Sequence, residues 1–448
     1  MKDMTKGSPV KLMLGFAIPL FIGNMVQLGY NLTDTWIVGR TISKDAIAQI
    51  GSTSALSSLM IGFLNGLCNG FSMIIARYFG AHDEKGLKKA VAHSIMLGTV
   101  TAIVISFFCL IFLKPLLRFF NVSDSLIVPA ASYIRIIFAG MIITLLYNLA
   151  SGILRAVGDT FMPMVYLIIA ALLNVGLDFF FILVLKTGVG GAAAATVIAQ
   201  CVSVILCFIH IYRHYPLLIV SKYDFCPDIP LISKLYGTGL SMAMMLSLVY
   251  VGTAALSMSI NKLGDNIIIA HTATRKVTEL FMLPFGVFGA TMAIFCGQNL
   301  GAKKIDRIQN GLKQIILLTW IWCIGTVIVS YTVLPYIIKF ITSSDNKEII
   351  YNATLYQKFD TLFYFVPAVI TIGRNSLQAI GDKISPLVSS CIEMIAKIIA
   401  AMLLTPVFGY WGIIVAEPIS WCLMVIPLII SFVKSPILKK NREQPSRL

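Results

Sequence analysis

The chain has 448 residues, of which 58% are hydrophobic and only 12% charged, and its mean hydropathy is +0.87. Soluble domains carry about a quarter charged residues, so this composition excludes a soluble enzyme or soluble binding domain. The net charge of +15 would suggest nucleic acid in a soluble protein, but here the basic residues gather in alternate loops, as membrane orientation requires.

Apolar runs between charged or Gly/Pro breaks predict an all-α polytopic membrane protein with twelve spans, since one crossing takes about 20 apolar residues. In chain order, the first six are expected at 11–39, 46–75, 88–113, 127–150, 161–185 and 189–211. The second six are expected at 232–260, 267–295, 311–338, 349–372, 386–406 and 411–433. The predicted domains are therefore an N-terminal six-helix lobe at 1–212, a polar cytoplasmic connector at 213–230, and a C-terminal six-helix lobe with a short basic tail at 231–448.

The distribution of basic residues predicts the orientation. With the N-terminus inside, 22 Lys and Arg fall in cytoplasmic segments and nine on the opposite side. Positively charged loops stay in the cytoplasm, so we expect a multi-pass protein of the plasma membrane with both termini cytoplasmic. The polar start does not have the form of a cleavable signal, and the first helix is expected to direct insertion. The nine cysteines form no CxxC spacing and are interpreted as small buried apolar residues.

Three short motifs recur in register, about 221 to 223 residues apart. They are Gly80-Ala81 with Gly301-Ala302, the Gly-Asp-x-x-x-Pro turns at 158–163 and 381–386, and the glycine-rich openings at 188–191 and 409–412. Each half crosses the membrane an even number of times, so both halves start on the same side. They are then related by a pseudo-two-fold axis along the membrane normal, an architecture typical of alternating-access transporters.

Two acids inside predicted spans are the first candidates for function. Asp34 lies in the first span, one helical turn beyond Tyr30. An ionisable group within a span is a functional candidate by default. The alternative is an acid near the outer interface that fixes the helix.

The second acid, Asp178, follows Asn174 by four residues, so the two side chains share one helix face. Together with the hydroxyl of Thr196 they can offer oxygens to a hard cation, or Asp178 can hold a proton. The alternative is a polar pair that only joins helices.

These features closely resemble the multidrug and toxic compound extrusion family across the whole chain. The resemblance rests on the two six-helix halves, the repeated loops and turns, the segment 30–35 and the Ala-Glu-Pro segment at 416–418. The chain looks like a bacterial member, similar to the DNA-damage-inducible branch. The resemblance implies a cation-coupling site, for H⁺ or possibly Na⁺, made of Asp34, Asn174, Asp178 and Thr196. It also implies a helix-1 bend at Pro19, although an ordinary transmembrane proline is an equal alternative.

The second half differs from the first at the matching positions, which are Ala255, Lys397, Ala401 and Glu417. A lysine cannot replace an amide ligand of a cation, so coupling is expected in the N-terminal lobe alone. We expect Lys397 to be neutralised by Glu393 or Glu417 in a structural charge cluster of the C-terminal lobe.

Several other residues have weaker interpretations. Arg275 and Glu279, four apart, are expected to form a salt bridge, with a substrate-facing role as the alternative. Arg155 and Arg374 are interpreted as topology or gate residues at cytoplasmic helix ends. A cavity lining, with ordinary helix packing as the alternative, is considered for Tyr30, Met242, Met245, Tyr250, Phe281 and Met282.

Taken together, the sequence predicts a secondary active antiporter that exports small organic compounds such as drugs or toxic metabolites in exchange for H⁺ or Na⁺. The alternative is a flippase of a lipid-linked precursor in the same superfamily. The chain lacks HExxH and GxxxxGK[ST] motifs, so neither an enzyme nor ATP-driven transport is expected. We expect no cofactor beyond the coupling ion, no nucleic-acid partner, and a monomer in the lipid bilayer.

Overall fold

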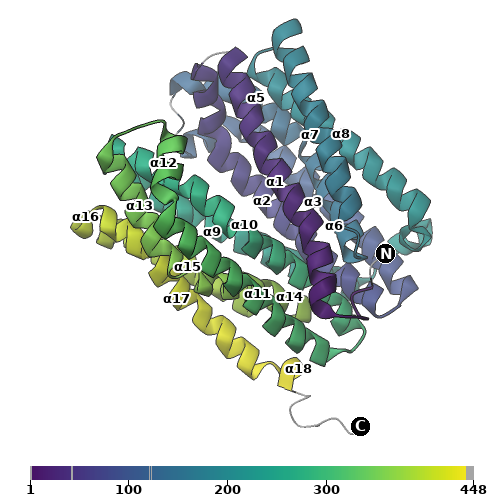
Figure 1. The fold of residues 1–448 in the computed structure, drawn as a ribbon. Helices are drawn as coiled ribbons and strands as arrows, with labels where there is room; N and C mark the ends of the chain where they lie inside the picture. Colours follow the sequence, from purple (N-terminus) through teal and green to yellow (C-terminus); the bar gives the residue numbers. More distant parts are fainter. Residues whose placement is uncertain (1–2, 42–43, 121, 123, 440–448) are drawn as a thin grey trace. The chain divides into compact units, whose positions relative to one another are not determined.

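The computed structural model describes residues 3–41, 44–120, 122 and 124–439, and all regular elements within these ranges are helical (Figure 1). The elements up to residue 260 are α1 (Pro9–Thr41), α2 (Lys44–Gly80), α3 (Glu84–Ile111), α4 (Leu113–Phe119), α5 (Asp124–Ala139), α6 (Met141–Ala156), α7 (Phe161–Phe179), η1 (Phe180–Val184), α8 (Val189–His214), η2 (Pro216–Leu218), η3 (Lys222–Phe225) and α9 (Ile229–Ile260). The remaining elements are α10 (Asp265–Gly301), α11 (Ile305–Thr332), α12 (Leu334–Thr342), α13 (Lys347–Thr361), α14 (Phe365–Ile380), α15 (Ile384–Ile399), η4 (Ala400–Leu404), α16 (Thr405–Phe408), α17 (Tyr410–Lys434) and α18 (Pro436–Lys439).

Ten helices of the described residues are long and apolar enough to cross a membrane, and α5 with α6 forms an eleventh span bent by 43° at Gly140. The predicted span at 349–372 is not one helix, because α13 ends at Thr361 and α14 begins at Phe365. α13 alone is too polar to be counted as a membrane span, since it carries four charged side chains in 15 residues. Counting α13 with α14 as a broken span gives the twelve predicted crossings, and the all-α polytopic fold is confirmed.

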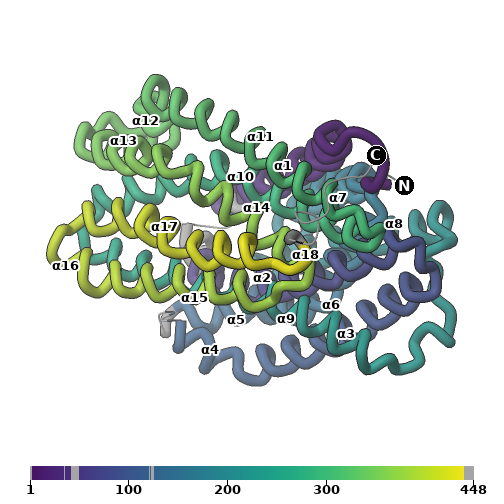
Figure 2. Tube along the Cα trace, turned by 90° about the horizontal axis from the view of Figure 1, so that it is seen from below, coloured from purple at the N-terminus to yellow at the C-terminus, as the bar shows by residue number. Residues whose placement is uncertain are grey.

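Two compact units make up the chain. One contains residues Met1–Lys6 and Leu14–Met244, and the other contains Gly7–Met13 and Met245–Leu448. The division falls inside α9 rather than in the connector. In the first unit α7 lies beside α8, and in the second α15 lies beside α17 (Figure 2). The predicted lobes follow the sequence repeat rather than this packing, so their boundaries stay predictions. The basic tail beyond residue 439 lies outside the described residues.

The repeated Gly-Asp-x-x-x-Pro turn stops one helix and starts the next in both halves. Gly158 and Gly381 adopt positive φ angles of 86° and 109°, a backbone conformation that glycine allows at a helix C-terminus. In each half the N–H of the following aspartate bonds to the carbonyl five residues earlier, at 2.9 Å. The carboxylates of Asp159 and Asp382 then cap the first turn of α7 and α15. The sequence repeat therefore encodes the same local structure twice.

Asp382 shows how strongly this turn holds its carboxylate. Burial alone would raise the pKa of Asp382, but hydrogen bonds from the Ser431 hydroxyl and from the N–H groups of Ile384 and Ser385 hold that pKa below its usual range. The turn therefore keeps a charged cap at the start of α15.

The connector is folded against α3. Lys89 forms an ion pair with Asp228, with 3.2 Å between Nζ and Oδ2, and the N–H of Asp228 lies 3.3 Å from His93 Nε2. Two short 3-10 turns, η2 and η3, fill the segment between α8 and α9. The polar character that predicted a connector thus supplies the contacts that fix it.

A close helix crossing joins α2 to the first half of α9. A Cβ added at Gly66 would lie 2.6 Å from the Ala243 backbone, and one added at Gly70 would lie 2.5 Å from the Gly239 backbone. Small residues let membrane helices approach this closely, so their packing attraction extends along both backbones.

Most cysteines are buried as predicted, but Cys226 and Cys422 are exposed, which contradicts that interpretation for these two.

We expect Gly70→Ala to lower the thermal stability of the purified protein, because the new methyl group would overlap backbone atoms that cannot move aside. Overpacking of this kind costs about 1–3 kcal/mol. Gly286→Ala in α10 is the control, since its Cβ would meet nothing within 4 Å. Thermal melts in detergent that shift equally for both variants would contradict the close crossing.

Candidate functional site

In the first unit, α1 and α7 bring Asp34 and Asp178 together. The two carboxyl groups lie close enough to act directly on each other. Asp178 is fully buried and Asp34 is partly buried. The Oδ1 atom of each has no hydrogen-bond partner among the described residues. Two carboxyl groups this close can hydrogen-bond to each other when they share a proton, so the arrangement is chemically able to hold one.

Asn174 and Thr196 complete the polar group around Asp178. With the Asn174 amide oriented so that both its atoms find partners, its nitrogen donates to Asp178 Oδ2 at 3.0 Å and its oxygen accepts from the Thr196 N–H at 3.2 Å. The Tyr30 hydroxyl donates to Thr196 Oγ1 at 3.3 Å. The four residues that the resemblance implied, with Tyr30, therefore lie together within one unit.

Tyr133 of α5 was missed by the sequence reasoning. Its hydroxyl is close enough to Asp34, Tyr30 and Asp178 to interact with them electrostatically. Its ring packs beside an apolar cluster that includes Ile37. Its only sequence signal is a hydroxyl-bearing ring in a predicted span, which is too common to single it out.

Two backbone features flank this site. α1 continues through Pro19 from Pro9 to Thr41, so the bend assigned to Pro19 stays a prediction. The π-helix η1 starts two residues after Asp178, and π segments occur frequently at functional sites. η4 is a π-helix at the corresponding place after α15, so the repeat preserves this irregularity as well.

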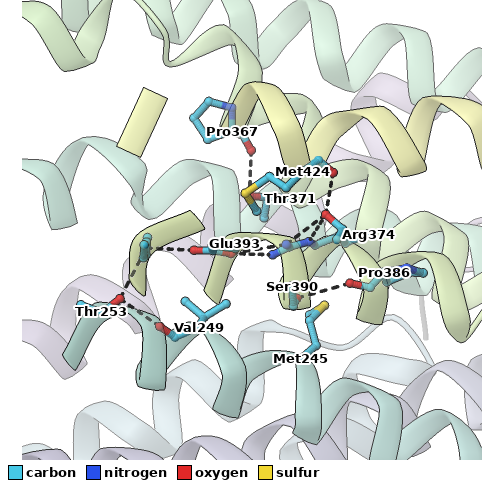
Figure 3. Close-up of polar contacts among 12 residues, drawn as sticks. Met245, Val249, Thr253, Pro367, Thr371, Arg374, Pro386, Ser390, Glu393 and Met424 are labelled. Carbon is cyan, nitrogen blue, oxygen red and sulfur yellow. Dashed lines mark hydrogen bonds and ion pairs between the residues drawn. The ribbon is translucent and has the colours of Figure 1, made fainter. Parts of the chain in front are cut away.

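In the second unit, five charged residues form a chain of alternating sign. Arg275 of α10 lies 3.5 Å from Glu417 of α17, which lies 3.4 Å from Lys397 of α15. Lys397 lies 3.0 Å from Glu393, which also pairs with Arg374 of α14 at 3.3 Å (Figure 3). Both ion pairs proposed for Lys397 are therefore present. The two arginines at the ends of the chain were not expected there.

Two interpretations of charged residues are wrong. Arg275 pairs with Glu417 rather than with Glu279, because α17 packs close to this part of the unit while Glu279 instead contacts Lys276 at 3.5 Å. Arg374 does not lie at a helix end, since it is the tenth residue of α14, and its gate role stays a prediction. It is 6% exposed and donates to Ser389 and Glu393 inside the unit.

Asp360 of α13 is a second residue that the sequence reasoning missed. It is 1% exposed, and neither carboxyl oxygen has a hydrogen bond of ordinary geometry within the described ranges. The Tyr364 hydroxyl approaches it, and Arg275, Glu417 and Lys397 act on it electrostatically. No sequence signal marked Asp360, because the segment around it looks like one continuous span, and only the structure shows that α13 ends at Thr361, one residue after Asp360.

The residues considered as a cavity lining fall into two groups. Met242, Met245 and Phe281 are buried, so the packing alternative accounts for them. Tyr250 is 43% exposed, and Tyr30 and Met282 are partly exposed. His271 packs against the rings of Tyr356 and Tyr410, as a packing histidine would.

A model of the MatE family matches residues 19–180 and 241–403, and so covers both halves. The chain belongs to the MatE family. It is 29% identical over 72% of its length to the probable multidrug resistance protein YoeA of Bacillus subtilis, covering 71% of that protein. It is 19% identical over 97% of both chains to the multidrug export protein MepA of Staphylococcus aureus. A crystal structure of MATE in the bent conformation has the same fold, with a TM-score of 0.90, 21% identity and 98% of both chains covered.

Membership of the MatE family makes the protein a multi-pass membrane transporter and not an enzyme. The two halves matched by the family model correspond to the two halves of the sequence repeat. The suggested relation to the DNA-damage-inducible branch stays a prediction.

We expect Glu393→Gln to destabilise the protein strongly, because this acid is the ion-pair partner of two buried cations, Arg374 and Lys397. Breaking a buried pair costs about 3–5 kcal/mol. Glu279→Gln is the matched control, since it breaks only an exposed pair with Lys276, worth at most about 1 kcal/mol. Equal thermal melting shifts for the two variants would show that the charge chain does not stabilise the unit.

Proposed function

We propose that this MatE protein is a secondary active antiporter that exports organic compounds in exchange for a cation. The observation that carries this proposal is the buried Asp34–Asp178 pair with Asn174 and Thr196 beside it. Carboxyl groups inside a membrane span are retained for function because they are costly to bury. The similarity to YoeA, a probable multidrug resistance protein, and to MepA, a multidrug export protein, supports drugs or other toxic compounds as the exported class.

The pair can couple ion binding to transport through its own chemistry. Two adjacent carboxyl groups cannot both ionise easily, so they take up and release one proton as a unit. When the pair takes up a proton from the outside, the repulsion between its two carboxylates is replaced by a hydrogen bond between the two carboxyl groups. An ion can drive a conformational change only when the two states bind it with different affinity. A change in the separation of α1 and α7 would supply that difference.

Sodium is the other coupling ion that these residues can accommodate. Two carboxylates, an amide oxygen and a hydroxyl are the oxygen donors that hard cations prefer. A shared proton needs only the two carboxyl groups, whereas a sodium ion would also need the Asn174 amide oxygen, which already accepts a hydrogen bond from the Thr196 N–H. We therefore propose H⁺ as the primary coupling ion.

The second unit is proposed not to take part in coupling. Its Glu393 and Glu417 each pair with two basic side chains, and Lys397 pairs with both acids. Acids that are each paired with two cations serve as structural ion-pair partners. We further propose a location in the plasma membrane with both termini in the cytoplasm, on the distribution of Lys and Arg.

We expect Asp34→Asn and Asp178→Asn each to reduce gradient-driven export at least roughly 10-fold, because an amide cannot carry the proton. Export is measured as dye efflux from inverted vesicles and as growth protection in a pump-deficient host. Asp345→Asn is the control, since Asp345 is an exposed acid whose one ion pair within the described ranges is with Lys339 on the surface. Normal export by the Asp34 variant would rule out this coupling site.

Proteoliposomes with separate gradients distinguish the two ions. We expect a pH gradient without Na⁺ to drive substrate movement, and a Na⁺ gradient at equal pH on both sides to drive little. Asp178→Asn should abolish the response to the pH gradient, because its carboxyl is half of the pair. A response to Na⁺ alone that depends on Asp178 would assign the site to sodium instead.

A further inference from the structure

The first half of α10 carries a charged face that is open to solvent. Arg275 is the eleventh residue of this 37-residue helix, about 15 Å from its start. The side chains of Lys276 and Glu279 are 51% and 45% exposed, and that of Arg275 is 31% exposed. Charged groups at such depth face water-filled space rather than acyl chains. This face of α10 therefore lies against water.

The charge chain ends on this face of α10 at a cation, Arg275. Its five members alternate as cation, acid, cation, acid, cation, so two acids serve three cations. At the inner end, Arg374 is buried and hydrogen-bonded to Ser389 and Glu393. At the outer end, Arg275 is accessible. Asp360 is close enough to act on Arg275 electrostatically, but it forms no ion pair with it.

The Arg275 guanidinium has N–H donors that its ion pair does not use. Within the described part of the chain, its one ion pair joins Nη1 to Glu417 Oε1 at 3.5 Å, and the same oxygen also pairs with Lys397. Among the described residues Arg275 makes no hydrogen bond of ordinary geometry. A guanidinium has five N–H donors in a planar fork that matches a carboxylate, sulfonate or phosphate. An accessible guanidinium with unused donors is a docking point for such an anion.

The neighbouring surface suits an apolar body attached to that anion. Met282 lies seven residues beyond Arg275 and so on the same face of α10. Tyr250 of α9 is 43% exposed and lies within electrostatic range of Glu279 on that face. A thioether and an aromatic ring accommodate varied apolar shapes.

We propose that Arg275 binds the anionic group of an amphipathic organic substrate, whose apolar part lies along Met282 and Tyr250. This inference rests on the proposed export function and deepens it, because it assigns the substrate class as organic anions or zwitterions rather than simple cations.

Two xanthene dyes of similar size and opposite charge test the proposal. Fluorescein is anionic and rhodamine 123 is cationic, and their binding to the protein in nanodiscs of zwitterionic lipid is measured by fluorescence anisotropy. We expect the native protein to bind fluorescein more tightly. Arg275→Gln should weaken fluorescein binding roughly 10-fold or more and leave rhodamine binding within about 3-fold. Arg275→Lys should fall between, since it keeps the charge and loses the fork.

Lys276→Gln is the matched control, because it removes the adjacent charge and should change fluorescein affinity by less than about 3-fold. The proposal fails if native protein shows no saturable fluorescein binding, if Arg275→Gln binds fluorescein normally, or if it loses both dyes equally. The assay uses no gradient, so Asp34→Asn should bind fluorescein normally. Retained binding with normal export by the Asp34 variant would overturn the coupling proposal alone, whereas loss of the Arg275 dependence would overturn only the anion site.

Discussion

The cost of an unpaired charge inside a membrane span governs both units of this protein. Such a charge must find a partner, a proton or water, since acyl chains offer none. The first unit meets this constraint with two carboxyl groups that share a contact. The second meets it with five side chains of alternating sign drawn from α10, α14, α15 and α17. The same fold repeat therefore holds a pair of neighbouring carboxyl groups in one unit and a chain of ion pairs in the other.

Local sequence signals predicted what depends on neighbours in the chain. Hydrophobic runs predicted the membrane spans. The repeated turns at Gly158 and Gly381 predicted matching helix ends in the two halves, because a positive φ and an aspartate cap depend only on neighbouring residues. Asn174 and Asp178 were placed on one face by spacing alone. Their proximity to Asp34 and Thr196 came from the family resemblance, since spacing says nothing about distances between helices.

What the sequence could not predict depends on contacts between distant helices. Arg275 and Glu279 have ideal spacing for a salt bridge, yet Arg275 pairs with Glu417 of another helix. Asp360 gave no signal in a segment that looked like one continuous span, and only the break between α13 and α14 shows how polar that crossing is. Spacing rules describe an isolated helix, and packing of several helices around a buried charge overrides them.

The division of α9 between the two units has a consequence for dissecting the protein. The connector ends before α9, so a cut at the repeat boundary would separate residues 229–244 from the unit that they complete. The glycine face of α2 at Gly66 and Gly70 would then lose the backbone that packs against it. A fragment that keeps this crossing must therefore extend to Met244, past the start of the second half of the repeat. The compact unit and the unit of sequence duplication do not share a boundary in this chain.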